Sequence, residues 1–337
     1  MTPVLVTGGA GYVGSHSVKA LAAAGRDVVV FDDLSAGHAE AVTRIAAAFP
    51  DRRIELVTGD IGNADVVTAT LERVRPSAVM HFAARLSVPE SVVDPAGYYR
   101  TNVIGTLTLL DAMVRAGVAR FVFSSTCAVF GEPEQLPIDE SHACRPINAY
   151  GETKLTIERA LAHFERAYGL KSIALRYFNA SGADPDGLLG EDHDPEIHLV
   201  PRAIFAAMGG PPLKVFGDDY PTPDGTCQRD YVHVADLAQA HLLALDRLEK
   251  GRESGAFNLG NGRAISVREI LEAVERVSGR PVPAEIAPRR PGDPARLVAS
   301  NGLARRELGW APQLAAIDDI VGTAWRWHQA HPRGYGD

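Results

Sequence analysis

The chain has 337 residues, of which 46% are hydrophobic and 23% are charged, and no apolar run in it approaches the roughly 20 residues of a membrane span. Lysine and arginine number 34 against 42 acidic residues, and the resulting formal charge of -8 argues against a nucleic-acid partner. Three cysteines without metal-ligand spacing, and a first strand that starts close to Met1, lead us to expect a cytoplasmic protein without a metal site or a membrane role.

Nearly continuous apolar runs of strand length recur in the first half of the chain, at residues 4–6, 28–31, 54–57, 78–82, 121–124 and 172–176. Such runs are typical of strands that are buried on both faces. Helix-length segments at 13–24, 103–116 and 149–168 end before Gly25, Gly117 and Gly169, which suit a left-handed cap. We therefore predict an α/β fold with a doubly wound, Rossmann-type parallel sheet.

After about residue 178 the chain becomes rich in proline and glycine loops with shorter helices. We predict a Rossmann domain over residues 1–178 and a smaller, mixed substrate lobe over 179–337, with segments that return to the first domain. Ligands of such sheets bind beyond the carboxyl ends of the strands, where the second lobe can close over them.

A glycine-rich turn, Gly8 to Gly14, follows the first strand and opens the first helix. Backbone amides at such a helix start face a pyrophosphate when no Cβ blocks the approach, so we assign Gly8, Gly11, Tyr12, Val13 and Gly14 to a dinucleotide.

The second strand ends in Asp32 and Asp33, close to the spacing at which an acidic residue binds the ribose. Two carboxylates without an adjoining arginine would repel a 2′-phosphate, so NAD is favoured over NADP. Asp60 and Ile61 end a third strand, where an adenine contact and a simple turn are equally good interpretations.

Tyr150 and Lys154 lie one helical turn apart, on a helix whose buried stripe we assign to Ile157, Leu161, Phe164 and Tyr168. A free phenol titrates near pH 10, so a tyrosine base needs a neighbouring cation, which Lys154 and oxidised NAD would supply. Thr126 follows a strand and could share a hydrogen bond with the substrate oxygen and Tyr150, or merely satisfy the local backbone. The set predicts a redox enzyme that acts on an alcohol.

These motifs, with the stretches 81–84, 102–106, 175–179, 216–222, 229–234, 258–262 and 288–293, resemble the extended short-chain dehydrogenase/reductase family. Within it the chain is similar to the members that interconvert UDP-glucose and UDP-galactose. The resemblance implies that NAD stores the C4 hydride transiently, Tyr150 takes the C4 hydroxyl proton, and the 4-keto sugar rotates and is reduced on its other face.

The resemblance also assigns further residues to the site. The cofactor contacts that it implies are Phe82, Ala83, Ala84, Asn102, Ser124, Tyr177 and Phe178, besides Tyr150 and Lys154. The substrate contacts that it implies are Thr126, Tyr150, Asn179, His198, Leu199, Phe216, Arg229, Tyr231, Arg290, Asp293 and Leu297, with Arg229 and Arg290 at the pyrophosphate. Arginine suits that place because its planar fork matches phosphate oxygens.

Five positions depart from the family pattern. His198, a lone histidine in a loop, stands where an asparagine is often found, and we interpret it as structural rather than catalytic. Phe130 replaces a usual tyrosine, Arg85 and Leu86 stand where a lysine is often found, and Leu297 is neither the bulky nor the small residue that gates a 2-acetamido group. Acceptance of UDP-N-acetylglucosamine, UDP-glucuronate or a UDP-pentose therefore stays open.

Two other functions compete with epimerisation. A sugar-nucleotide 4,6-dehydratase needs an acid and a base beside Thr126, where Cys127 and Ala128 offer no carboxylate. A non-catalytic NAD-sensing protein would not need the intact Thr126, Tyr150 and Lys154.

We also expect a homodimer through helices 103–116 and 149–168. Their apolar residues Leu107, Leu110, Met113, Ile157 and Leu161 cover more than one helix face.

Overall fold

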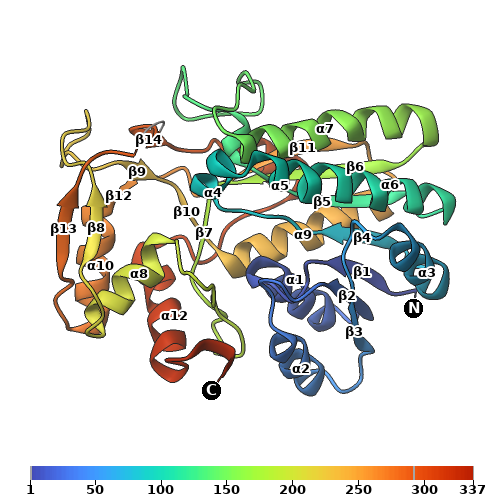
Figure 1. The fold of residues 1–337 in the computed structure, drawn as a ribbon, viewed down its shortest axis with the longest axis horizontal. Helices are drawn as coiled ribbons and strands as arrows, with labels where there is room; N and C mark the ends of the chain where they lie inside the picture. The colour runs from blue at the N-terminus through green and yellow to red at the C-terminus, as the bar shows by residue number, and fades with distance from the viewer. Residues whose placement is uncertain (1, 291–292, 337) are drawn as a thin grey trace.

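A seven-stranded parallel sheet forms the centre of the computed structural model, which describes residues 2–290 and 293–336 (Figure 1). Its strand order is β11-β6-β5-β4-β1-β2-β3. The strands are β1 (Val4–Thr7), β2 (Val28–Asp32), β3 (Ile54–Thr58), β4 (Ala78–His81), β5 (Arg120–Thr126), β6 (Lys171–Tyr177) and β11 (Gly255–Leu259). The predicted doubly wound fold and its six strands are confirmed.

Helices cover both faces of this sheet, and each face has its own apolar core. One face carries α1 (Tyr12–Ala23), α2 (Ala39–Ala48), α9 (Val234–Glu249) and α11 (Gly302–Leu308). The other carries α3 (Ala64–Val74), α6 (Thr106–Arg115) and α7 (Ala149–Tyr168). Both β11 and α9 come from the second half of the chain, so the sheet is completed by residues far from the first six strands.

The predicted helix ends are correct, but one helix start is wrong. Gly25, Gly117 and Gly169 have φ values of 78°, 71° and 71°, which is the left-handed conformation that glycine adopts without strain. The segment predicted as one helix from residue 103 begins instead as a π-helix, η1 (Tyr99–Gly105), which continues into α6. Two short helices, α4 (Val88–Val93) and α5 (Pro95–Tyr98), precede it.

Two predictions about the apolar residues of these helices also need correction: the buried stripe of α7, and the apolar residues that we assigned to a dimer interface. Tyr168 is 61% exposed, because it lies in the last turn of α7 beyond the residues that reach the sheet. Leu110, Met113, Ile157 and Leu161 all lie in the core of a single chain, since α3 packs on α6 and covers its second face. Their apolar character is therefore no argument for a subunit interface.

The second lobe has a separate apolar core between α8 (Leu199–Ala207), α10 (Val267–Ser278) and α12 (Ile317–Ala330), seen at the left of Figure 1. Its small sheets pair β8 (Leu213–Phe216) with β13 (Ala284–Ala287), β9 (Gln228–Arg229) with β12 (Ile265–Ser266) and β14 (Arg296–Leu297), and β7 (Asn179–Ser181) with β10 (Tyr231–His233). Because β7 begins two residues after β6 ends, this lobe is joined directly to the carboxyl edge of the large sheet.

No helix among the described residues is long and apolar enough to span a bilayer.

Candidate active site

The glycines of the turn between β1 and α1 allow close backbone packing and leave the turn accessible to a ligand. Gly8 has φ +71°, and a Cβ there would lie 2.3 Å from the Ala83 nitrogen; a Cβ on Gly14 would lie 2.1 Å from the Gly8 oxygen. At Gly11 the nearest atom would be 3.5 Å away. Gly11 precedes α1, and no described side chain caps this helix start. The first amide groups of α1 are thus free for an anion, which fits the pyrophosphate of a dinucleotide.

Asp32 ends β2 beside this turn and is buried. Its carboxylate accepts hydrogen bonds from the backbone nitrogens of Ala10 and Leu34, both at 2.9 Å. Burial raises the pKa of Asp32, and these two hydrogen bonds oppose that rise. Asp32 therefore ties the glycine turn to β2, and each oxygen retains a lone pair for a ribose hydroxyl.

The neighbouring acidic residues are exposed. Asp33 accepts hydrogen bonds from the nitrogen and hydroxyl of Ser35. Asp60 accepts a hydrogen bond from the Gly62 nitrogen at 2.7 Å, as expected for an aspartate that forms a turn. Ile61 is buried in the core.

The loop after β4 is held by Asn102. The amide of Asn102 accepts a hydrogen bond from the Arg85 nitrogen at 2.8 Å and donates to the Arg85 oxygen at 3.0 Å and the Thr153 hydroxyl at 3.2 Å. This fastens the segment that contains Phe82, Ala83 and Ala84 to η1 and α7. Phe82 packs against His241 with ring centroids 4.6 Å apart.

The three predicted catalytic residues come from β5 and α7. Thr126 is the last residue of β5 and is buried, and Asn148 caps the start of α7 through the Gly151 nitrogen at 2.9 Å. Lys154, which is only 3% exposed, points back to β5 and donates to the Ser124 oxygen at 2.8 Å. Its Nζ lies 6.0 Å from the centre of the Tyr150 ring.

Burial governs the protonation of this group. It raises the pKa of Tyr150, and a hydrogen bond with Thr126 opposes that rise. It lowers the pKa of Lys154 from 10.5 to about 7, which the charge of Glu158 partly offsets. The Lys154 amine faces the Ser124 carbonyl, and its effect on the pKa of Tyr150 beside a bound NAD stays a prediction.

The Thr126 hydroxyl accepts a hydrogen bond from the Ala128 nitrogen at 3.1 Å, as a turn threonine does. The same hydroxyl favours the ionised form of Tyr150, and its bond to a substrate oxygen stays a prediction. Tyr177, at the end of β6, forms a short hydrogen bond with the Ser124 hydroxyl. Phe178 follows it and is buried.

The strand pairings of the second lobe bring the predicted substrate residues together. Asn179 and Tyr231 are register partners between β7 and β10, and Arg229 and Leu297 are partners between β9 and β14. Asp293 forms a close ion pair with Arg229. The lobe thus gathers polar side chains next to the carboxyl edge of β6.

A second arginine of the lobe is placed over an aromatic ring. The guanidinium carbon of Arg290 lies 3.9 Å from the centre of the Phe216 ring. Burial lowers the pKa of Arg290, which indicates a cation that is short of compensating acceptors. Pro291 and Gly292 of the same stretch lie outside the described residues.

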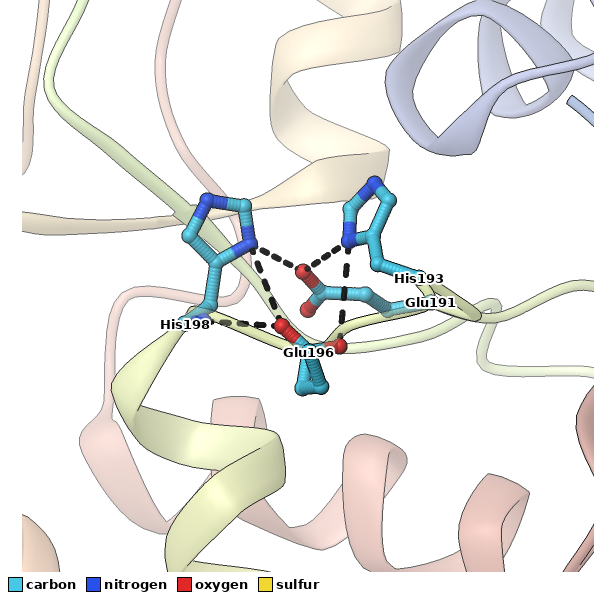
Figure 2. Close-up of side chains that lie close together, drawn as sticks. All are labelled: Glu191, His193, Glu196 and His198. Carbon is cyan, nitrogen blue, oxygen red and sulfur yellow. Dashed lines mark hydrogen bonds and ion pairs between the residues drawn. The ribbon is translucent and has the colours of Figure 1, made fainter. Parts of the chain in front are cut away.

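His198 has different neighbours. It occupies the N-cap position of α8, next to Leu199, without a capping hydrogen bond from its side chain. It forms a close ion pair with Glu191, which His193 also approaches at 3.1 Å (Figure 2). Glu196 completes this cluster of four side chains. Sequence reasoning missed the cluster because it treated His198 as a lone histidine; the signal was the alternation of acids and histidines over residues 191–198.

Two of the departures from the family pattern, Phe130 and Arg85, have structural explanations. Phe130 is buried beneath the Arg176 guanidinium, 5.2 Å from the ring centre. Arg85 pairs with Glu90 and Asp94, while Leu86 is 39% exposed. The Arg85 guanidinium is therefore paired with the carboxylates of Glu90 and Asp94.

Known proteins match nearly the whole length of this chain. The model of the NAD dependent epimerase/dehydratase family matches residues 4–260. The UDP-glucose 4-epimerase of Rhizobium meliloti is 51% identical over 98% of this chain and 98% of its own. The UDP-glucose 4-epimerase from Brucella ovis in complex with NAD has a TM-score of 0.92 at 50% identity, covering 97% of this chain and 98% of that one. The enzyme from Bifidobacterium longum in complex with NAD+ and UDP has a TM-score of 0.94 at 37% identity, covering 99% and 100%. The chain belongs to the NAD dependent epimerase/dehydratase family.

Proposed function

We propose that the chain is a NAD-dependent epimerase that interconverts UDP-glucose and UDP-galactose. The arrangement that supports this function has Tyr150, Lys154 and Thr126 at the carboxyl edge of the sheet, and Arg229 and Arg290 in the lobe that β7 joins to that edge. Relatives of about 50% identity over nearly the full length have this activity by name.

The catalytic residues divide the proton chemistry among them. Tyr150 removes the proton of the C4 hydroxyl and returns it after the 4-keto sugar has rotated to present its other face. Thr126 is the hydrogen-bond partner of Tyr150 and orients the sugar oxygen. NAD held at the glycine turn and by Lys154 would supply reversible storage of the C4 hydride. Lys154 binds the cofactor ribose, and its positive charge there favours the ionised form of Tyr150.

Residues of the second lobe bind the rest of the substrate. Arg229 and Arg290 neutralise the diphosphate. Arg229 either breaks its ion pair with Asp293 or binds Asp293 and the diphosphate at the same time. Phe216 lies beneath Arg290 and offers its ring to the uracil. Asn179, Tyr231, Asp293 and Leu297 surround the sugar and its linkage. We assign residues 1–178 to NAD and 179–337 to the nucleotide sugar, with β11, α9 and α11 returning to the first domain.

A dehydratase is a weaker alternative. The carboxylate nearest in sequence to Lys154 on the same helix face is Glu158, and it is held by Arg176 at 3.0 Å and by the Ser125 hydroxyl. A carboxylate neutralised in this way is a poor general acid or base for elimination.

The decisive experiment supplies UDP-galactose to the purified protein without added NAD. We expect UDP-glucose as the product, identified by chromatography and proton NMR, because retained NAD serves as an internal hydride store. A 4-keto-6-deoxy sugar would instead show a dehydratase, and turnover confined to UDP-N-acetylglucosamine, UDP-glucuronate or a UDP-pentose would assign a different epimerase.

We further propose a cytoplasmic homodimer. Its three cysteines are unpaired, as is typical of a reducing compartment. Large apolar side chains remain exposed on α4 and η1, which pack beside α5 and α7: Val92, Val93, Tyr99 and Ile104 are 65%, 81%, 40% and 58% exposed. Exposed apolar residues gathered on neighbouring helices are typical of a subunit interface, and a second copy of the chain would cover them.

A further inference from the structure

Four metal-ligating side chains converge in the segment that leads from β7 to α8. Glu191, His193, Glu196 and His198 each offer one ligand atom, and these atoms all lie within 4.8 Å of one another (Figure 2). The side chains of Glu191, Glu196 and His193 are 3%, 7% and 13% exposed. His198 is 34% exposed, so the group is a mixed set of carboxylates and imidazoles that is buried at the glutamates and open to solvent at His198.

Hydrogen bonding within the cluster leaves two of these atoms unsatisfied. His193 Nδ1 lies 3.1 Å from Glu191 Oε1 and 3.7 Å from Glu196 Oε2. Yet His193 Nδ1 and Glu196 Oε2 are fully buried and have no hydrogen-bond partner in the part of the chain that the structure describes. Buried polar atoms without a partner are costly and rare. The two atoms lie in ion pairs of the cluster that do not meet hydrogen-bond geometry, and a cation shared between them would give each a direct partner.

The separations suit a small divalent cation. Zinc binds histidine nitrogen and carboxylate oxygen at about 2.0–2.2 Å in a tetrahedron, whose ligand atoms are then about 3.3–3.6 Å apart. The His193–Glu191 and His193–Glu196 distances of 3.1 and 3.7 Å bracket that value, whereas His198 and Glu191 lie closer together and would have to separate around the ion. Two imidazoles favour zinc or another first-row transition metal over calcium or magnesium.

We propose that Glu191, His193, Glu196 and His198 bind one divalent transition-metal ion, with Zn²⁺ as the best match. Four protein ligands make this a closed, structural site rather than a catalytic one. The hydrogen bond between His198 and Glu191 is replaced by the two bonds to the ion. The metal site does not depend on the proposed epimerase activity, but it shares His198 with the substrate contacts that the family resemblance implies.

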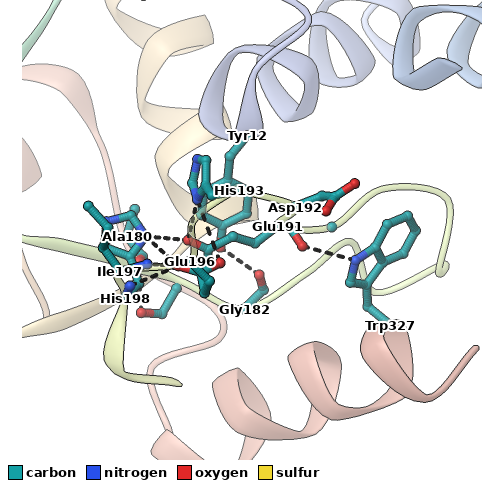
Figure 3. Close-up of polar contacts among 12 residues, drawn as sticks. Tyr12, Ala180, Gly182, Glu191, Asp192, His193, Glu196, Ile197, His198 and Trp327 are labelled. Carbon is teal, nitrogen blue, oxygen red and sulfur yellow. Dashed lines mark hydrogen bonds and ion pairs between the residues drawn. The ribbon is translucent and has the colours of Figure 1, made fainter. Parts of the chain in front are cut away.

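Contacts around the ligands hold them in place (Figure 3). The backbone nitrogens of Ile197 and His198 donate to Glu196 Oε1 at 2.7 and 2.8 Å, which turns Oε2 toward the cluster. Trp327 Nε1 of α12 donates to the Glu191 backbone oxygen at 3.2 Å. Such outer contacts orient the ligands of metal sites.

The ion would brace this segment against the glycine turn. Tyr12, in the first turn of α1, donates to the Gly182 oxygen at 2.5 Å, and its ring meets that of His193 edge to face at a centroid distance of 6.1 Å. Loss of the ion should therefore loosen the connection between the β7–α8 segment and the dinucleotide turn, and lower the melting temperature of the holoenzyme.

The test uses tag-free holoenzyme that is treated with a chelator and then dialysed against micromolar Zn²⁺. We expect elemental analysis to find about one zinc per chain, and Co²⁺ in its place to give the visible absorption of a four-coordinate site. Glu196→Gln and His193→Asn should weaken zinc binding at least tenfold. Glu132→Gln, which alters an exposed glutamate elsewhere, is the matched control and should keep the ion.

The melting temperature is a second measurement. Zinc should raise it by a few degrees in the wild type and the control, but not in Glu196→Gln, whose folding is checked by circular dichroism and NAD content. Equal zinc content in the wild type and Glu196→Gln would overturn the proposal. Absence of zinc and of a cobalt band in the wild type would also overturn it, and would leave the cluster as two imidazolium–carboxylate pairs.

Discussion

The Tyr150 hydroxyl is the atom on which the proposed proton transfer depends. In the cofactor-free chain burial raises its pKa, so the phenol is protonated and Thr126 is its hydrogen-bond partner. We predict that Tyr150→Phe lowers turnover of UDP-galactose by about 10²–10⁴-fold, the usual contribution of a general base. Retained NAD and the affinity for UDP, measured by absorbance and calorimetry, should stay near wild type. Normal turnover in this variant would remove Tyr150 from the mechanism.

Lys154 has a pKa of about 7 because it is buried, against 10.5 for a free lysine. Between these values the unfolded chain binds more protons than the folded chain, so the contribution of Lys154 to stability rises with pH. We predict that the unfolding free energy of the cofactor-free wild type, relative to Lys154→Met, increases by about 3 kcal/mol from pH 7 to pH 9.5. Urea denaturation at several pH values measures this difference.

Lys214→Met removes an exposed lysine of β8 and provides the control for the pH series. The difference in unfolding free energy between Lys214→Met and the wild type should change little with pH. A flat difference for Lys154→Met as well would show that the buried amine is solvated in solution.

At the scale of the elements, a buried ion pair anchors α7 on the sheet. Arg176 of β6 bonds Glu158 of α7 at 3.0 and 3.1 Å, and both side chains are 9% exposed. Arg176→Met would leave the glutamate buried without a cation, so we predict a loss of about 3–5 kcal/mol in unfolding free energy. The double variant Glu158→Gln/Arg176→Met should lose less than Arg176→Met alone. A similar loss in both, by chemical denaturation, would contradict this account.

Regular patterns made most of the sheet predictable from the sequence. The first six strands are continuous apolar runs, and Gly25, Gly117 and Gly169 mark helix ends by their own conformational freedom. The strand β11 was not predicted, because its pairing with β6 depends on a contact between distant segments. The same holds for the π-helix start at Tyr99, since a local apolar period does not specify i to i+5 hydrogen bonds.

The residues of the candidate site also fall into two groups: those that could be predicted from spacing along the chain, and those whose contacts depend on the tertiary fold. Tyr150, Lys154 and the glycine turn follow from spacing within one element, and the structure places them at one sheet edge. The pairing of Arg229 with Asp293 and the gathering of His198 with Glu191 require the tertiary fold. Sequence reasoning placed the lysine on the correct face but not its hydrogen bond to the Ser124 carbonyl.

At the scale of the whole molecule, the exposed apolar side chains of α4 and η1 determine the assembly that we propose. Val93 and Ile104 are 81% and 58% exposed, and a second copy would bury them. A carboxylate in such an interface has no partner, so Ile104→Asp should raise the dimer dissociation constant at least a hundredfold, or about 2.7 kcal/mol. Sedimentation at micromolar concentration should show a wild-type dimer and a monomeric variant. Ile286→Asp, at a 54% exposed residue of β13 in the other lobe, should remain dimeric. A monomeric wild type, or a dimer that survives Ile104→Asp, would place the subunit contact elsewhere or abolish it.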